Sequence, residues 1–405
     1  MKALKHIFCS TIAALFLVSC VDGSIDMYTE IHEDGTCVRE LFFYADSISL
    51  VNPKEATGML KSIFVDEKWN KSWTVKDTTA NEVIMEGVYP MTPKQYHEAK
   101  TRLQSKSSSD GDTAFIDLTP VKIQICAKRE FPTVEKMGSE LPIVINGHQV
   151  TRKAKLTKRF RWFYTDYVYT ETFESFAPQF EIPLSDFMDE NALNYWLTGS
   201  PDIFKGYSGL EQKEYLDEME NKFFQYINAN MCNDYFKLMA DHYELFPNAP
   251  MSKEEFLAKG KELTDNHDLL SFNPLESDTL TKIICQYLGT HEYNTCTEDN
   301  ENRLNQLWQE QSERYGFILT FNADYVLRMP GGIVNINDCR NMKFKDGKLH
   351  AQLNGIRLLA PEYTIQASSS VKNEWALWLS LLIGLVAIIL CGTGIWRKKN
   401  KASKV

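Results

Sequence analysis

The sequence lacks the short motifs that mark the common catalytic and metal sites. It has no HExxH, GxSxG, Walker A or GxGxxG pattern, and His291-Glu292 is not followed by a second histidine one helical turn later. Gly206-Tyr207-Ser208-Gly209 falls short of a nucleophile elbow, and its serine suits a helix cap. The pair Asp110 and Asp112 offers far fewer oxygens than the roughly six to eight that calcium takes. We therefore expect no metal, no cofactor and no catalysis.

Basic residues are also in the minority between the two ends of the chain. The whole sequence has 44 Lys and Arg against 54 Asp and Glu. Two basic residues lie in 1–19 and five in 397–405, which leaves 37 against 54 between them, a net charge of −17. Such an acidic region excludes nucleic acid as the expected partner, and an anionic lipid surface should repel it.

Nine cysteines occur, and none has the spacing of a zinc site. Cys9 and Cys391 fall in apolar terminal segments, and Cys20 ends the first of them. The other six are Cys37, Cys126, Cys232, Cys285, Cys296 and Cys339. In an oxidising compartment six cysteines allow up to three disulfides. Cys285 and Cys296 would close a short loop and are the expected pair; the alternative is that several of the six are buried thiols.

Charge is absent from residues 375–396, the longest apolar run. At about 1.5 Å per residue this run spans the roughly 30 Å hydrocarbon core of a bilayer. Trp375, Trp378 and Trp396 lie near its ends, and the basic tail 397–405 follows directly. Tryptophan favours the headgroup region and positive charge stays cytoplasmic. The sequence therefore predicts a transmembrane helix with its C-terminus in the cytoplasm; a buried core helix is the alternative.

The N-terminus has the pattern of a bacterial export signal. Lys2 and Lys5 precede an apolar run that ends in Leu17-Val18-Ser19-Cys20. That ending resembles the lipobox of bacterial lipoproteins, which implies a signal peptide at 1–19 and a lipid (palmitate among its acyl chains) on Cys20. An ordinary signal with a chance cysteine is the alternative. Because helical spans are typical of inner membranes, we expect a single-pass inner-membrane protein with a periplasmic ectodomain.

The pattern of strands and helices predicts an α+β fold. Residues 20–182 are β-rich, 183–315 are helical and 316–372 are β-rich again. The simplest arrangement is one membrane-proximal β-rich domain with a helical insertion, plus the C-terminal transmembrane helix; two consecutive domains are the alternative. The expected elements are a hairpin at 24–46, helices starting at 92, 185, 208, 252 and 298, a hairpin at 141–153, a long strand at 156–176, strands at 317–321, 325–329, 333–336, 348–353 and 363–367, and a polar stalk at 366–373.

Residues 159–169 combine aromatic and basic side chains in one strand-like run. Alternation puts Phe160, Trp162 and Tyr164 on one face, which we expect to fill a core because aromatic side chains bury large areas. The alternative is a surface for sugar rings or lipid headgroups, formed by Arg152, Lys153, Arg161 and Trp162. The basic residues before 160 are interpreted as a solvated strand edge that discourages aggregation.

The C-terminal portion resembles a known group of proteins. The resemblance lies in three C-terminal segments, Met329-Pro330-Gly331-Gly332-Ile333, Lys345-Asp346-Gly347-Lys348-Leu349 and residues 363–367 before a span, and in the N-terminal turn His32-Glu33-Asp34-Gly35. These segments are similar to those of bacterial envelope lipoproteins of the LppM-like type. The resemblance implies a β-rich, non-catalytic envelope lipoprotein and supplies no active-site residues.

Three functions follow as hypotheses. The first is a double-anchored periplasmic lipoprotein that acts as a non-catalytic interaction or assembly component of the cell envelope, with an envelope protein as its partner. The second is a module that binds envelope lipid or glycan through residues 152–169. The third is an enzyme with a site assembled from distant acidic residues.

Overall fold

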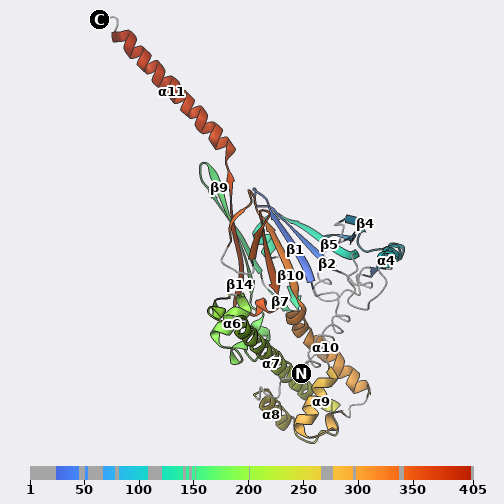
Figure 1. Ribbon diagram of the computed structural model, residues 1–405. Helices are drawn as coiled ribbons and strands as arrows, with labels where there is room; N and C mark the ends of the chain where they lie inside the picture. The colour runs from blue at the N-terminus through green and yellow to red at the C-terminus, as the bar shows by residue number, and fades with distance from the viewer. Residues whose placement is uncertain are drawn as a thin grey trace.

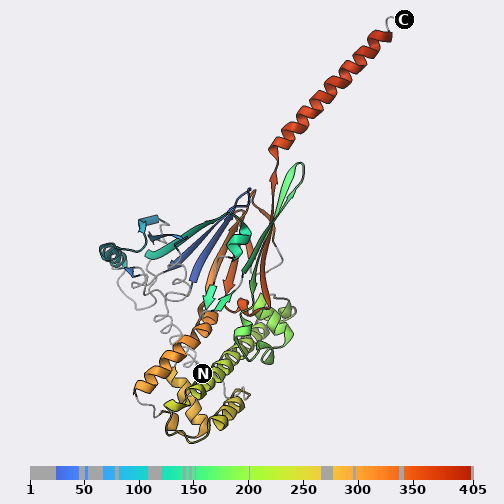
Figure 2. The same cartoon turned by 180° about the vertical axis from the view of Figure 1, so that it is seen from behind.

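The computed structural model of the 405-residue chain describes residues 24–44, 51–52, 67–77, 82–107, 121–139, 143–145, 148–150, 152–199, 201–265, 277–294, 298–336 and 342–402. Two β-sheets form the middle of the molecule. Helices α6 to α10 gather at one end of the strands, and the long helix α11 projects from the other end (Figures 1 and 2).

The larger sheet has eight strands in the order β12-β13-β10-β1-β2-β5-β3-β4. In chain order they are β1 (Ser24–Ile31), β2 (Cys37–Tyr44), β3 (Asn70–Asp77), β4 (Glu82–Val88), β5 (Val121–Phe131), β10 (Asn322–Arg328), β12 (Met342–Lys345) and β13 (Lys348–Asn354). β1 and β10 pair in parallel, whereas the other neighbours are antiparallel. The β1–β2 pair confirms the predicted hairpin at 24–46, including its turn.

The smaller sheet has four strands in the order β11-β14-β9-β8. They are β8 (Arg152–Phe160), β9 (Tyr164–Glu174), β11 (Ile333–Ile336) and β14 (Glu362–Lys372). β8 is an edge strand, as the sequence suggested, and α5 (Val134–Ser139) packs against it. The predicted hairpin at 141–153 is confirmed by β6 (Ile143–Ile145) and β7 (His148–Val150).

The two sheets form a sandwich because their central strands alternate buried and less buried side chains. Ile25, Met27 and Ile31 of β1 are buried, and so are Tyr167 and Phe173 of β9. The residues that alternate with the buried ones, such as Asp26 and Tyr28 of β1 and Val168 of β9, are less buried and point away from the core. Both sheets receive strands from before and after the helical region, which is the arrangement expected for a β-rich domain with a helical insertion.

The helical region consists of α6 (Glu190–Thr198), α7 (Gly209–Asp241), α8 (Lys253–Thr264), α9 (Ser277–Leu288) and α10 (Glu298–Thr320). Capping boxes begin two of these helices: Ser208 and Glu211 start α7, and Ser252 and Glu255 start α8. Both starts were predicted. The α4 helix (Pro93–Ser107) likewise begins where Thr92 and Gln95 predicted it.

Two predictions at the end of the helical region were wrong. The helix from 298 was expected to stop at Gly316, with a strand at 317–321, but α10 continues to Thr320. Phe317 packs against Phe176 and Phe321, with ring centroids 5.5 and 4.6 Å apart, and Ile318 is buried. These contacts outweigh the modest helix penalty of one glycine, about 1 kcal/mol.

Two predictions in the smaller sheet were also wrong. Residues 156–176 are two strands, β8 and β9, joined by a tight turn. Residues 366–373 are not a stalk, because β14 pairs with β9 through Lys372. The serines of β14 misled the prediction: Ser369 is small and faces the buried side of the sheet, where it is 1% exposed.

Candidate functional site

The turn between β8 and β9 is the part of the predicted surface that lies closest to α11. We name residues 160–164 the hairpin tip. Arg161 N donates to Tyr164 O at 2.7 Å, and Tyr164 N donates to Arg161 O at 3.2 Å, which closes a turn around Trp162 and Phe163. The tip protrudes beyond the rest of the sandwich beside the start of α11 (Glu374–Ala402) (Figure 1).

Asn373, the single residue between β14 and α11, binds the hairpin tip. Its side-chain Nδ2 donates to Arg161 O at 2.7 Å and to Trp162 O at 3.2 Å, while its Oδ1 accepts from Thr165 Oγ1 at 2.9 Å. Its backbone N–H donates to Phe163 O at 2.9 Å. One buried amide therefore fastens the tip to the first turn of the apolar helix.

Aromatic side chains continue this contact along α11. The Phe160 ring stacks on Trp375 with centroids 6.1 Å apart, and Trp162 meets Trp375 edge-on at 5.6 Å. Trp162 Nε1 donates to Ser380 Oγ at 2.8 Å. The expectation that Phe160, Trp162 and Tyr164 fill a core was wrong, since they are 57%, 43% and 45% exposed.

The structure does not bring the four predicted surface residues together. Arg161 and Trp162 lie at the tip, whereas Arg152 and Lys153 lie at the opposite end of β8, paired with Phe173 and Thr172. Lys153 forms an ion pair with Glu174 at 3.3 Å, and Arg161 forms one with Asp166 at 2.7 Å. The predicted patch is therefore two separate surfaces, one at each end of a nine-residue strand.

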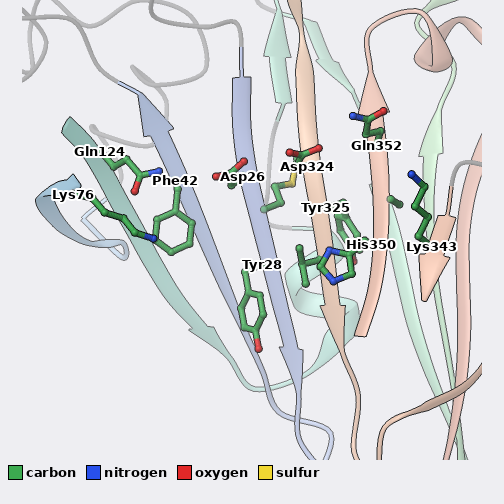
Figure 3. A pocket seen from close by; sticks show the side chains of 13 residues that line it. Asp26, Tyr28, Phe42, Lys76, Gln124, Asp324, Tyr325, Lys343, His350 and Gln352 are labelled. Atoms are coloured by element: carbon green, nitrogen blue, oxygen red, sulfur yellow. The ribbon is translucent and has the colours of Figure 1, made fainter. Parts of the chain in front are cut away.

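A groove of about 630 Å³ lies on the outward face of the eight-stranded sheet, opposite the sandwich core. Figure 3 shows Asp26 and Asp324 next to each other on adjacent strands, flanked by Phe42 and Gln352. Tyr28, Lys76, Gln124, Lys343 and His350 also line it. Two carboxylates lie between lysines here, and within the described residues no cluster of three or more His, Cys, Asp and Glu side chains has the arrangement of a metal site.

The groove can bind a polar ligand by hydrogen bonds and ring contacts. Asp26 and Asp324 accept hydrogen bonds, Gln124 and Gln352 both donate and accept, and Phe42 supplies a half-buried ring. Sequence reasoning missed the groove, because Asp26 and Asp324 become neighbours only through the parallel pairing of β1 with β10.

A buried polar network joins the two sheets behind this groove. Arg39 Nη2 of β2 donates to both carboxylate oxygens of Glu171 of β9 at 3.1 Å, and both side chains are 0% exposed. Glu171 Oε2 also accepts from the hydroxyls of Tyr169 and Tyr325, each at 2.6 Å. Burial raises the pKa of Tyr325, so this phenol stays a neutral donor.

The network was missed in the sequence, although a signal was present. Arg39 and Glu171 occupy positions that the alternation of β2 and β9 assigns to the buried face, between apolar or aromatic neighbours. Two opposite charges at core positions of two strands are expected to pair, because an isolated buried charge is very costly. The pairing joins the two sheets inside the core.

Among the described cysteines, Cys37, Cys232 and Cys285 are buried, Cys126 is half-buried and Cys391 on α11 is exposed. Cys37, Cys126 and Cys232 are free thiols, and burial raises the pKa of Cys37 and Cys126 to about 11 and that of Cys232 to about 12. Cys285 is buried in α9, but Cys296 lies outside the described residues, so their pairing stays a prediction. Residues 1–19 and Cys20 also lie outside them.

The apolar segment of α11 has the length and composition of a membrane span. Glu374–Thr393 covers 20 residues with a mean hydropathy of 2.4, and 6% of its most apolar stretch is buried in the protein. A core helix of a soluble protein would be mostly buried.

Comparison with known proteins gives no assignment: no protein-family model matches the chain, and no curated protein or solved structure shows significant similarity to it.

Proposed function

We propose that this chain is a non-catalytic envelope protein of the LppM-like kind, fixed in the bacterial inner membrane by α11. Its sandwich and helical region would lie on the periplasmic side, and the basic tail in the cytoplasm. The observation that carries the proposal is the junction at Asn373. The sheet strand β14 passes into the apolar helix through one residue, which is hydrogen-bonded to the hairpin tip. Such a junction supports a domain with a set orientation to the bilayer.

The helical region is the part of this arrangement that suits a partner protein. It lies at the end of the sandwich away from α11 (Figure 1), where a periplasmic partner would meet it without contacting the bilayer. Its outward surface is acidic along the first half of α7, which carries Glu211, Glu214, Asp217, Glu218 and Glu220. A partner with a basic face would be favoured there.

Photo-crosslinking in intact cells tests this role. A photoreactive amino acid at Leu210, 68% exposed at the start of α7, should give one discrete protein adduct. The same probe at Val334, 70% exposed on β11, is the matched control and should give none. Equal adducts at both positions, or none at Leu210, would contradict a partner site on α7.

Ser24, the first described residue and four positions after the predicted lipidation site Cys20, lies at the end of the sandwich away from α11. Ser24 pairs with Asn322 beside the end of α10, and β1 runs from there toward the α11 end. β1 has eight residues and covers about 25 Å, whereas the four steps from Cys20 to Ser24 cover at most about 14 Å. With the strands upright on the bilayer, Cys20 would not reach the membrane that α11 crosses. We therefore propose that α11 is the segment that holds the protein in the inner membrane. Lipidation of Cys20 is a separate proposal.

Fatty-acid labelling separates the two anchors. Wild-type protein should incorporate an alkyne fatty acid and Cys20→Ala should not, while both stay in the inner-membrane fraction after alkaline extraction. Loss of Cys20→Ala from the membrane would overturn α11 as the residence anchor. Absence of label on the wild type would favour an ordinary signal peptide.

The second candidate function is glycan binding in the groove. It is favoured by the combination of Phe42 with Asp26 and Asp324, because sugars present hydroxyls to carboxylates and an apolar ring face to aromatic side chains. Titration of the full chain in detergent with soluble peptidoglycan fragments tests it. Binding that Asp324→Asn weakens and Val334→Ala leaves unchanged would support this function.

A further inference from the structure

The hairpin tip carries exposed aromatic side chains beside the start of the apolar helix α11. We propose that residues 160–164 lie in the headgroup region of the bilayer that α11 crosses, with the basic residues behind them against lipid phosphates. The proposal rests on α11 being a span, and it adds a second, β-structured contact with the same membrane.

The depth follows from the bond between Trp162 and Ser380. Trp162 Nε1 lies 2.8 Å from Ser380 Oγ, and Ser380 is six residues into a 20-residue apolar segment. At about 1.5 Å per residue, six residues are about 9 Å along the helix axis, out of about 30 Å for the segment. Trp162 Nε1 therefore lies beside the first third of the segment, near the end at which the span would enter the membrane and where tryptophan is favoured.

Exposure of the tip fits a lipid contact and not water. Trp162 and Phe163 are each 43% exposed, and Trp375 and Trp378 on the adjoining helix are 53% and 72% exposed. The rings of Phe160 and Trp162 both contact Trp375, which joins exposed aromatic side chains from two segments of the chain. Exposed apolar surfaces of this kind mark interaction sites. Continuity with α11 makes the bilayer interface the occupant.

The charges next to the tip match the same occupant. Lys158, Arg159, Arg161 and Lys372 are exposed within three residues of the tip or of α11. Arg161 pairs with Asp166 at 2.7 Å, Glu374 begins α11, and Lys158 Nζ donates to the backbone carbonyl of Glu33 at 2.7 Å. Arg159, Arg161 and Lys372 are exposed beside the apolar helix, and basic residues near a bilayer gain about 1 kcal/mol each from anionic lipid.

Attachment to Asn373 makes the contact directional. Four hydrogen bonds join Asn373 to residues 161, 162, 163 and 165, so the tip does not swing independently of α11. Two points of contact, the helix and the tip, set the tilt of the sandwich over the membrane. A single span would leave rotation about its own end free.

Depth-dependent fluorescence quenching tests the proposal. The full chain, with a fluorescent amino acid at Phe163, is placed in nanodiscs of phosphatidylethanolamine and phosphatidylglycerol. Spin labels on the headgroup or at carbon 5 of the acyl chain should quench Phe163, and a label at carbon 12 should quench it less. The matched control, Val334, is 70% exposed on β11 and should not be quenched by any of them. Equal quenching at Phe163 and Val334, or none at either, overturns the proposal.

A probe at Leu385 separates failure of the tip from failure of the span. Leu385 lies in the middle of Glu374–Thr393, so a spanning α11 gives its strongest quenching from the carbon-12 label. Quenching at Leu385 without quenching at Phe163 overturns the tip proposal alone. No quenching at either overturns the membrane assignment of α11 as well. Phe163→Asp provides a further check: it should move a probe at Trp378 to shallower quenching, and an unchanged Trp378 profile would count against the tip.

Discussion

The β sandwich has a fully buried ion pair between its two sheets, whereas the ion pair of the helical region, Arg314 with Asp234, is only partly buried. In the sandwich, the charge pair Arg39–Glu171 joins β2 of one sheet to β9 of the other. In the helical region, aromatic side chains pack against one another: the ring centroid of Phe256 lies 4.8 Å from that of Phe236 and 4.9 Å from that of Tyr293. An ion pair in a dry core has one good geometry, whereas neighbouring rings can shift to close a gap. The sandwich should therefore depend on single residues more than the helical region does.

The largest expected effect is in the sandwich. Glu171→Leu leaves the Arg39 guanidinium buried without its carboxylate, which should cost about 3–5 kcal/mol of unfolding free energy. Adding Arg39→Met removes the orphaned charge and should restore most of that loss. Urea unfolding of the full chain in detergent, with hydrogen exchange of β2 and β9 as a local readout, measures both variants. If the double variant were no more stable than either single variant, the loss could not be attributed to the unpaired charge of this ion pair.

A core substitution in the helical region should cost less. Phe256 is fully buried among Phe236, Tyr243 and Tyr293, and Phe256→Leu keeps most of its volume. We expect a loss of about 1–2 kcal/mol, because the surrounding rings can move into the space. Hydrogen exchange of α8, with Leu257→Ala on the partly buried side of the same helix as the reference, checks it. A loss as large as that of Glu171→Leu would remove the contrast between the two regions.

The same contrast explains which parts of the fold could be predicted. The starts of α7 and α8 depend on two residues three apart, so Ser208 with Glu211 and Ser252 with Glu255 were enough to find them. The β1–β2 hairpin was visible for a similar local reason, since Gly35 supplies the positive φ of its turn. Elements whose formation depends on residues close together in the sequence could therefore be predicted from the sequence.

The features that were missed depend on partners far away in the sequence. The turn at the hairpin tip contains Arg161, Trp162 and Phe163, none of them a typical turn residue. Besides the backbone hydrogen bonds that close it, the turn accepts hydrogen bonds from Asn373, which is distant in the sequence. Asp26 and Asp324 come from the two ends of the chain and meet only because β1 pairs with β10. A single sequence carries the residues of such sites but not their neighbours.

A smaller effect is expected at the start of α8. Ser252 Oγ accepts from Glu255 N at 3.2 Å, and Ser252→Ala removes this cap at a cost of about 1 kcal/mol. The helix itself should remain, because Phe256 and Leu263 stay buried in the core of the helical region. Faster hydrogen exchange confined to the first turn of α8 would show that the cap stabilises only the helix end and that packing stabilises the rest. Loss of the whole helix would show that caps, not rings, stabilise this region.

The smallest effect is a pH dependence at the start of α7. The backbone N–H of Ser208 donates to Glu211 Oε2 at 2.7 Å, and this hydrogen bond lowers the pKa of Glu211 below its usual 4.5. A lowered folded-state pKa means that the stabilisation is present above the usual value and is lost as the pH falls through the folded value. Hydrogen exchange of the first turn of α7, corrected for intrinsic rates, should therefore become faster as the pH is lowered below the usual glutamate pKa of 4.5. Glu211→Gln keeps the acceptor without its titration and should remove that pH dependence, whereas the same change at Glu214, which lies outside the capping box, should leave it intact.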